Sequence, residues 1–215
     1  MSGKSQKKSK VMDETTISLF EQGSTSDTRK TYIIFGVGRG GTTMVAGVAK
    51  LCGLDIGEDL PINLEDNDFN LAVLKKKGIG QPVVHIINVL AQRNQSKDIW
   101  GWKFPRAIAY LPLIREHLVN PHLILVSRDP IATATREILS GTPKMDAIEL
   151  VLRLQLRNME LVKQWEAPTL IVSYERSIQR PEQFITDMCG FLGVERPVDT
   201  ADIRAFMQPG EYKVI

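Results

Sequence analysis

The sequence predicts a single α/β domain in which a mostly parallel central sheet is covered by helices on both faces, a three-layer α/β/α arrangement. Short apolar runs rich in β-branched and aromatic residues occupy residues 32–35, 99–104, 122–127 and 169–173. They alternate with longer runs whose apolar residues recur at helical spacing. Strands that alternate with helices form parallel sheets that are buried on both faces. The 215 residues suffice for one such domain, and no internal repeat or interior linker divides them.

The first thirty residues differ in composition from the rest of the chain. Ser, Thr, Lys and Gln dominate them, and the first ten residues contain four lysines and no acid. The apolar residues form one small cluster, Ile17, Leu19 and Phe20. We therefore expect a disordered basic tail over residues 1–30 and a single domain over residues 31–215.

The remaining elements follow in a regular order. A short strand at residues 54–56 and an acidic, irregular loop at 61–70 are expected after the first helix, and another helix should begin at Ile131. The other predicted helices share apolar residues at helical spacing and cover residues 44–51, 71–77, 82–95, 107–118, 144–166, 181–192 and 200–207.

Composition and charge argue against several classes of function. The chain is 43% hydrophobic and 24% charged, with a formal net charge of +2, and without the tail lysines it is slightly acidic. This charge disfavours nucleic-acid binding. The three histidines and two cysteines lack metal-ligand spacing, so we expect no metal.

The cysteines and the hydropathy pattern predict a cellular location. Cys52 and Cys189 lie in apolar, helix-like contexts and are expected to be buried free thiols, which suits a reducing compartment. No apolar run reaches membrane-spanning length, and the first residues do not resemble a signal peptide. We therefore expect a cytoplasmic protein without stable membrane insertion. The sequence does not specify an oligomeric state.

The stretch TYIIFGVGRGGTTM, residues 31–44, has the composition of an anion-binding loop. Four glycines follow the first strand, with Arg39 among them, and Thr42 and Thr43 precede an apolar helix. Glycines permit close backbone approach, and the free N–H groups at a helix start bind anions. The stretch predicts phosphate binding.

Two interpretations of this loop follow from its spacing. The glycines satisfy the dinucleotide fingerprint G-x-G-x-x-G, and Asp55 and Glu58 lie near the distance of a ribose-binding acid. The loop also approaches the P-loop pattern G-x-x-x-x-G-K-[ST], with Thr42 in the place of the lysine and Arg39 as a substitute cation. The second interpretation predicts a kinase that uses magnesium and ATP.

A third interpretation takes R-G-G-T-T-M, residues 39–44, as a unit. This unit resembles the 5′-phosphosulfate loop of the sulfotransferases, [KR]-S-G-T-[ST] followed by an apolar residue, with Gly40 in place of the family serine. The resemblance implies a P-loop-like fold, a sulfuryl donor, 3′-phosphoadenosine 5′-phosphosulfate (PAPS), and no metal. It implies that the donor is bound by Arg39, Gly40, Gly41, Thr42, Thr43 and Met44. A basic side chain beside the bridging oxygen stabilises the charge that develops there.

A second family signature follows the strand at residues 122–127. Arg128 stands where the family places an arginine on the 3′-phosphate of the nucleotide, and Arg136 stands where the family has a serine. Arg136 would bind the phosphate by a bidentate contact, or Thr133 or Thr135 would supply a hydroxyl. Tyr174, after the strand at 169–173, resembles a family tyrosine near the nucleotide.

The acceptor side is predicted from three further residues. Lys103, before a proline at the end of a strand, matches a family position that faces the acceptor. Attack by the acceptor requires a general base, for which Glu65 is the first candidate and Asp66 the second. For His85 a structural role is expected. After Val194 the sequence shows no counterpart of the additional C-terminal nucleotide contacts of some family members.

The resemblance thus implies transfer of a sulfuryl group from PAPS to a hydroxyl or amine. The expected acceptor is a small molecule or a glycan, for example a carbohydrate or a lipid-linked glycan. Small alcohols and phenols are further possible acceptors. Two alternatives are a P-loop kinase and a non-catalytic nucleotide-binding module.

Overall fold

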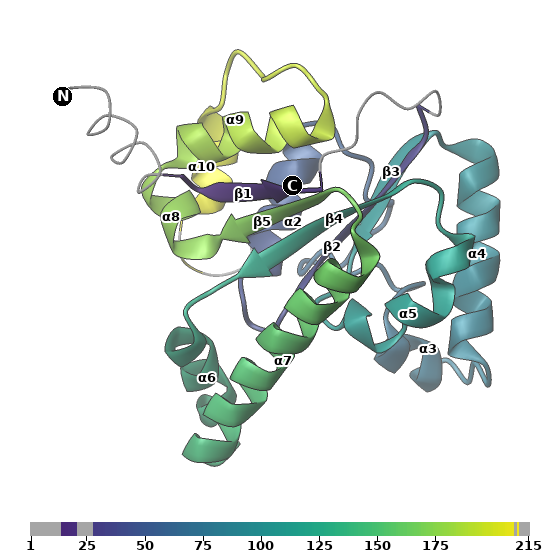
Figure 1. Ribbon diagram of the computed structural model, residues 1–215, viewed down its shortest axis with the longest axis horizontal. Helices are drawn as coiled ribbons and strands as arrows, with labels where there is room; N and C mark the ends of the chain where they lie inside the picture. The colour runs from purple at the N-terminus through teal and green to yellow at the C-terminus, as the bar shows by residue number, and fades with distance from the viewer. Residues whose placement is uncertain (1–13, 21–27, 209, 211–215) are drawn as a thin grey trace.

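The computed structural model describes residues 14–20, 28–208 and 210, and it contains a five-stranded sheet between two layers of helices (Figure 1). The strand order is β1-β5-β4-β2-β3. The parallel strands are β2 (Lys30–Gly36), β3 (Ile99–Lys103), β4 (Pro121–Ser127) and β5 (Thr169–Ser173), and β1 (Thr16–Leu19) pairs antiparallel with β5. The predicted α/β class with a mostly parallel sheet is confirmed.

Helices connect the strands and follow the last one. They are α2 (Thr42–Leu51), α3 (Leu71–Lys76), α4 (Pro82–Ser96), α5 (Leu111–Ile114), α6 (Pro130–Leu139), α7 (Lys144–Trp165), α8 (Tyr174–Gln179), α9 (Pro181–Leu192) and α10 (Ala201–Met207). Two 3₁₀ turns, η1 (Ala107–Ala109) and η2 (Arg115–His117), flank α5. In Figure 1, α6 and the first half of α7 extend away from the sheet.

Two sequence predictions about elements are wrong. The helix expected over residues 107–118 is broken into η1, α5 and η2, because Pro112 has no N–H to continue an α-helical ladder. Residues 54–56 do not form a strand. Asp55 O accepts one bond from Gly101 N of β3 at 2.8 Å, and Gly57, at φ 110°, turns the chain away.

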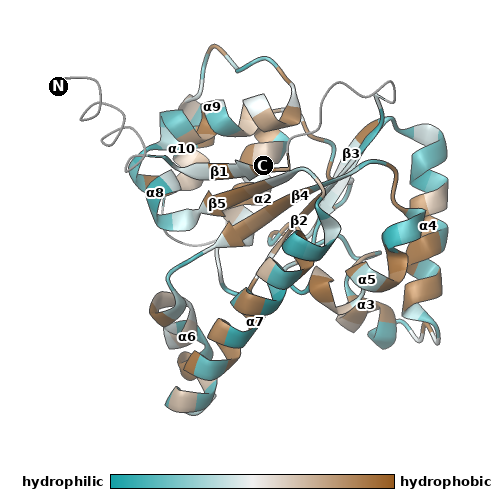
Figure 2. Cartoon of the chain, in the orientation of Figure 1, coloured by the Kyte–Doolittle hydropathy of each residue, from teal (hydrophilic) through white to brown (hydrophobic). Residues whose placement is uncertain are grey.

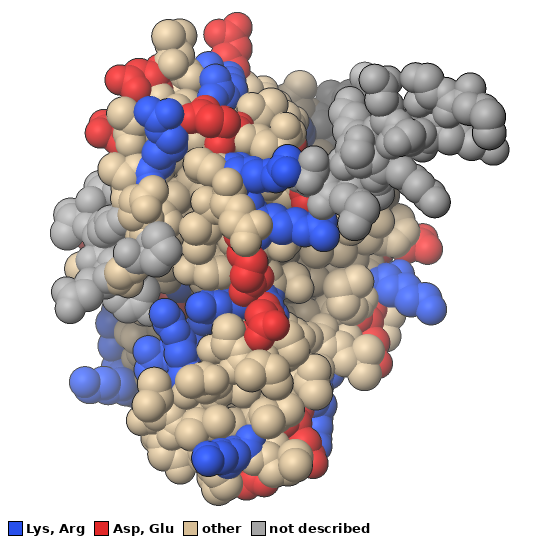
Figure 3. All heavy atoms as spheres, turned by 90° about the vertical axis from the view of Figure 1, so that its left-hand side faces the viewer, with Lys and Arg blue, Asp and Glu red and all other residues tan. Residues whose placement is uncertain are grey.

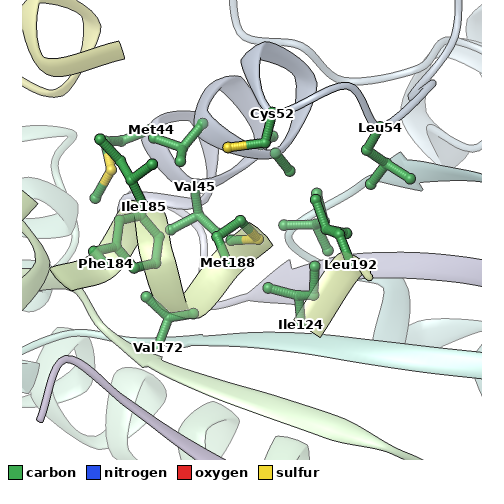
Figure 4. Close-up of a cluster of buried hydrophobic side chains, with 14 of the residues drawn as sticks. Met44, Val45, Cys52, Leu54, Ile124, Val172, Phe184, Ile185, Met188 and Leu192 are labelled. Atoms are coloured by element: carbon green, nitrogen blue, oxygen red, sulfur yellow. The ribbon is translucent and has the colours of Figure 1, made fainter. Parts of the chain in front are cut away.

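The alternating side chains of β2 supply both halves of the core. Tyr32 and Ile34 pack with α2, α9 and α10, whereas Ile33 and Phe35 pack with α3, α4, α5 and the end of α7. Alternation is expected of a strand, whose successive side chains point to opposite faces. Figure 2 shows the strands β4 and β5 in hydrophobic colours, and Figure 4 shows the first cluster between α2, α9 and the sheet. The sheet is therefore covered on both faces.

The edge strand β1 corrects the prediction of a disordered tail through residue 30. Thr16–Leu19 pairs with β5, and Ser173 N donates to Thr15 O at 3.0 Å. The hydroxyls of Thr15 and Thr16 also donate to Asp187 Oδ2 at 2.6 and 2.9 Å. A short edge segment is held mainly by these backbone bonds, which any side chains permit, so the composition of the tail does not reveal the strand. The rest of the predicted tail, residues 1–13 and 21–27, lies outside the described residues.

The two cysteines are buried free thiols, as predicted. Cys52 ends α2 and Cys189 lies in α9, so both belong to the same face of the core. Burial raises the pKa of the Cys52 thiol far above its ordinary value, and a hydrogen bond with Cys189 adds to this. Over the described part of the chain, no helix has the length and hydrophobicity that crossing a membrane requires.

Candidate functional site

A cavity of about 660 Å³ opens where the parallel strands end. In open α/β sheets, ligands bind at the carboxyl ends of the strands. Ten of the residues that the sequence singled out line this cavity: Arg39, Gly41, Thr42, Thr43, Met44, Glu65, Lys103, Arg128, Arg136 and Tyr174. Figure 3 views this side of the molecule and shows basic side chains gathered above the lobe that α6 and α7 form. Gly40 and Asp66 are absent from the lining.

The loop between β2 and α2 is shaped by its glycines. Gly41 caps α2 with a φ of 87°, and a Cβ on Gly41 would lie 2.2 Å from the ring of Tyr174. A Cβ on Gly40 would lie 2.7 Å from the carbonyl oxygen of Val37, which accepts a bond from Gly40 N at 2.9 Å. A serine at position 40 does not fit this loop conformation. This explains the departure from the family pattern at Gly40.

Arg128 fixes the loop to the end of β4. Its Nη1 donates to the carbonyl oxygen of Arg39 at 3.0 Å, and its guanidinium lies 4.4 Å from the centre of the Tyr174 ring. Glu175 lies 3.7 Å from Arg128 Nε, which is buried and has no hydrogen-bond partner among the described residues. The Nε group is thus buried beside the Glu175 carboxylate without a hydrogen bond of its own.

Lys103 places a buried amine at the end of β3. Its side chain is 1% exposed, and Nζ donates to Asn63 O at 2.9 Å, Glu65 Oε1 at 3.2 Å and Thr43 Oγ1 at 3.3 Å. Burial lowers the pKa of Lys103 to about 8, and the Glu65 carboxylate partly opposes this change. The lysine therefore connects the glycine-rich loop between β2 and α2, residues 37–41, which we call the phosphate loop after its predicted ligand, with the acidic segment at 61–70.

The structure separates the two acidic candidates. Glu65 lines the cavity, and its Oε2 accepts a bond from Asn70 Nδ2 at 3.0 Å. Asp66 is 4% exposed and lies 2.7 Å from Arg93 Nη1. Asp66 therefore pairs with α4, and Glu65 is the carboxylate that the structure brings to Lys103.

Arg136 lies in α6 and lines the cavity from there. Its guanidinium has no hydrogen bond or ion pair within the described ranges. The alternative hydroxyls are not available, because Thr133 donates to Asp129 O at 3.0 Å and Thr135 to Ile131 O at 2.8 Å. Neither threonine lines the cavity.

The residues that favoured a dinucleotide site lie elsewhere. Asp55 Oδ2 lies 2.5 Å from Lys97 Nζ, and neither Asp55 nor Glu58 lines the cavity. His85 lies 3.3 Å from Asp68 Oδ1 and is likewise outside the lining. The loop therefore lacks the acid of a dinucleotide fingerprint.

Several cavity residues escaped the sequence analysis. Arg106 and Asn63 line the cavity, and the C-terminal segment contributes Phe206, Met207, Gln208 and Gly210. Arg106 follows Lys103-Phe104-Pro105 directly, so its position after a predicted strand was a usable signal. The C-terminal residues had no such signal, because they reach the cavity only through the docking of α10 on α2.

The site combines a cradle for an anion with cationic side chains. The N-terminus of α2, the loop amides and Arg39 converge with Lys103, Arg128 and Arg136 on one cavity. In the part of the chain that the structure describes, no group of three or more His, Cys, Asp or Glu residues is arranged to hold a metal. The arrangement can bind a polyanion and stabilise negative charge that develops on it.

Solved structures share this fold, among them two sulfotransferases and a kinase. The sulfotransferase domain from the curacin biosynthetic pathway has a TM-score of 0.55 and 14% identity, covering 88% of this chain and 80% of that chain. A mouse sulfotransferase complexed with PAP has a TM-score of 0.51 and 14% identity, covering 84% and 65%. Shikimate kinase from Bacteroides thetaiotaomicron has a TM-score of 0.50 and 11% identity, covering 77% and 99%. These likenesses show the fold, which sulfotransferases and a kinase share.

Sequence comparison distinguishes between the sulfotransferases and the kinase. No curated protein sequence matches the chain. A family model described as the sulfotransferase family matches residues 71–198, more than half of the chain, including Lys103, Arg128 and Tyr174. The chain belongs to the sulfotransferase family.

Proposed function

We propose that the protein transfers a sulfuryl group from PAPS to a hydroxyl or amine of an acceptor. The observation that carries this proposal is the buried amine of Lys103, held against the phosphate loop in the cavity that Arg39 and Arg128 also line. The mouse relative by fold was solved with PAP, the nucleotide product of such a reaction. Family membership supports the same donor for this chain.

The residues of the cavity fit a sulfated nucleotide with two phosphate groups. Two guanidinium groups at the cavity, those of Arg39 and Arg136, have no hydrogen bond or ion pair in the described ranges. Arg128 Nε is a buried donor without a hydrogen bond. We assign Arg39, Gly41, Thr42 and Thr43 to the 5′-phosphosulfate end and Arg128, Arg136 and Tyr174 to the 3′-phosphate end. When bound, PAPS supplies the sulfuryl group.

The roles of the protein side chains follow from their charge and position. Arg39 would stabilise the negative charge that forms on the departing phosphate oxygen. Lys103, as an ammonium group, would stabilise the oxygens of the sulfuryl group in the transition state of the transfer. Glu65 would accept the proton of the acceptor hydroxyl, because Lys103 and Asn70 hold it at the cavity in a fixed orientation. Asp66 has no role in this scheme, since it pairs with Arg93.

The alternative is a kinase, which the likeness to shikimate kinase favours at the level of the fold. Binding titrations with PAP, without metal, and with ATP plus magnesium distinguish the two. We expect tight, metal-independent binding of PAP, whereas a preference for magnesium and ATP would refute the proposal. PAP binding without any formation of PAP from PAPS, across a panel of acceptors, would instead indicate a non-catalytic module.

Replacement of Arg39 tests the loop directly. Arg39→Ala should reduce the rate of PAP formation from PAPS by about 100-fold or more, because a preorganised cation at the leaving group is lost. The matched control is Arg153→Ala, because Arg153 is 71% exposed on α7 and pairs with Glu149 in the same helix. An Arg39→Ala enzyme that keeps full activity would show that the loop has another role.

A further inference from the structure

The proposed function gives roles to four of the basic side chains that line the cavity and none to Arg106. Arg106 is exposed at the cavity. Within residues 14–20, 28–208 and 210, its guanidinium makes no hydrogen bond or ion pair. An arginine in a concave site, with all its donors free, is suited to an anion.

The backbone of Arg106 is held in place by its neighbours. Gly36 N donates to the carbonyl oxygen of Pro105 at 3.2 Å, which ties the residue before Arg106 to the end of β2. Arg106 itself caps η1, and its carbonyl oxygen accepts a bond from Ala109 N at 3.0 Å. The guanidinium therefore extends from a fixed point into the cavity.

The strand order places Arg106 away from the 3′-phosphate end of the cavity. It follows β3, the strand at the edge of the sheet, whereas Arg128 follows β4, on the other side of β2. Adjacent strands lie about 4.8 Å apart, so two such spacings separate the ends of β3 and β4. Arg106 Nε lies 3.8 Å from the point that a Cβ on Gly38 would occupy, so the side chain lies beside the phosphate loop. This is the side of Lys103 and Glu65.

No carboxylate among the described residues neutralises Arg106. Two carboxylates line the cavity. Glu65 is engaged by Lys103 and Asn70, and Glu137 belongs to α6, which also carries Arg136. Among the described residues, the positive charge of Arg106 therefore has no carboxylate that balances it.

We propose that Arg106 binds a negatively charged group of the acceptor, which is a carboxylate, phosphate or sulfate ester on the molecule whose hydroxyl is sulfated. This inference rests on the proposed function, because it takes the Lys103 end of the cavity as the acceptor end. It narrows the acceptor to anionic hydroxyl compounds. A neutral alcohol would offer the guanidinium no opposite charge.

The test uses the full chain loaded with PAP and two matched pairs of probes, glucose 6-phosphate with glucose and 4-hydroxybenzoate with 4-hydroxybenzamide. Calorimetric titration should show that the charged member of at least one pair binds about 10-fold or more tightly than its neutral partner. Arg106→Gln should remove this preference, and Arg106→Lys should retain part of it. Arg153→Gln, which also removes one exposed charge, should leave it unchanged.

Other outcomes overturn the inference. If, in both pairs, the charged probe and the neutral probe bind with equal affinity, the acceptor end of the cavity does not distinguish charged from neutral molecules. A loss of about 10-fold or more in the affinity for PAPS in Arg106→Gln would assign Arg106 to the donor instead. Failure of the proposed function is seen separately, since PAP binding to the unmodified protein is measured before any acceptor is added.

Discussion

Lys103 carries an ionisable amine in a position from which water is almost excluded. Its side chain is 1% exposed, and its three hydrogen-bond partners are Thr43, Asn63 and Glu65. A buried ion pair of this kind contributes little net stability, because desolvation offsets the attraction between the charges. Strongly perturbed pKa values are concentrated at functional sites. The cost of burying Lys103 is therefore consistent with a catalytic role.

The pH dependence of stability should reveal this buried amine. The folded-state pKa of Lys103 is about 8, below the ordinary value of 10.5, so between these values the unfolded chain binds a proton that the folded chain does not. Stability should rise with pH in this window. Relative to Lys103→Met, the unmodified protein should gain about 2 kcal/mol of unfolding free energy between pH 8 and pH 10. Urea unfolding of both proteins at each pH measures the difference, and parallel curves would contradict the lowered pKa.

At the scale of the element, the short helix α3 is joined to the site by its N-cap. The side-chain oxygen of Asn70 accepts bonds from Ala72 N at 3.0 Å and Val73 N at 3.3 Å, and its Nδ2 donates to Glu65. The Oδ1 atom of Asn70 thus accepts bonds from free N–H groups at the start of the helix, and its Nδ2 group orients the Glu65 carboxylate. Helix capping and the geometry of the site share one side chain.

Two substitutions of Asn70 should separate these effects. Asn70→Ala removes the cap and should cost about 1 kcal/mol of unfolding free energy. Asn70→Ser keeps a capping oxygen, so it should retain most of the stability, but it has no amide to reach Glu65. Both variants should form PAP from PAPS roughly 10-fold more slowly, because the carboxylate loses its fixed orientation. If Asn70→Ser has full activity, Asn70 serves only as a cap.

At the scale of the whole molecule, the C-terminal helix completes the cavity. A Cβ on Gly47 of α2 would lie 1.9 Å from the ring of Phe206, so the glycine is what allows α10 to pack this closely. Glu182 of α9 holds α10 from the other side, since it pairs with Arg204 and accepts a bond from Thr200. The end of α10 lines the cavity. Distant parts of the chain thus meet at the cavity.

A double-mutant cycle tests this contact. In a helix, replacement of glycine by alanine normally stabilises by up to about 1 kcal/mol. Here Gly47→Ala should instead destabilise by about 1–3 kcal/mol, because the new methyl group overlaps the Phe206 ring. In a Phe206→Ala background, Gly47→Ala should increase the unfolding free energy, as glycine-to-alanine changes in helices normally do. Urea unfolding of the four proteins gives the coupling free energy, and additive effects would refute the contact.

PAP affinity gives a second measurement on the same four proteins. Gly47→Ala alone should weaken PAP binding, because α10 and the cavity residues that it carries are displaced. Gly190→Ala in α9 is a suitable control, since a Cβ there would meet nothing within 4 Å. Unchanged PAP affinity in Gly47→Ala would mean that α10 stabilises the fold without shaping the proposed nucleotide site.

The sequence by itself determined the α/β class and ten of the residues that line the cavity. Each of these signals is local: an apolar run, a glycine loop before a helix, or a basic residue directly after a strand, as with Lys103 and Arg128. In a parallel sheet all strands end at the same edge, so residues that follow different strands are brought together by the topology alone. Arg39, Lys103 and Arg128 could therefore be predicted to share a site.

Only the tertiary structure decided which side chains are paired. Glu65 and Asp66 are adjacent in an irregular loop, and the path of this loop sends one to Lys103 and the other to Arg93. The edge strand β1 is held by backbone pairing with β5. The amino-acid composition of residues 16–19 does not indicate this pairing. Phe206 reaches the cavity through contacts with a helix more than a hundred residues earlier in the chain. Such contacts depend on packing between distant segments, and no local periodicity encodes them.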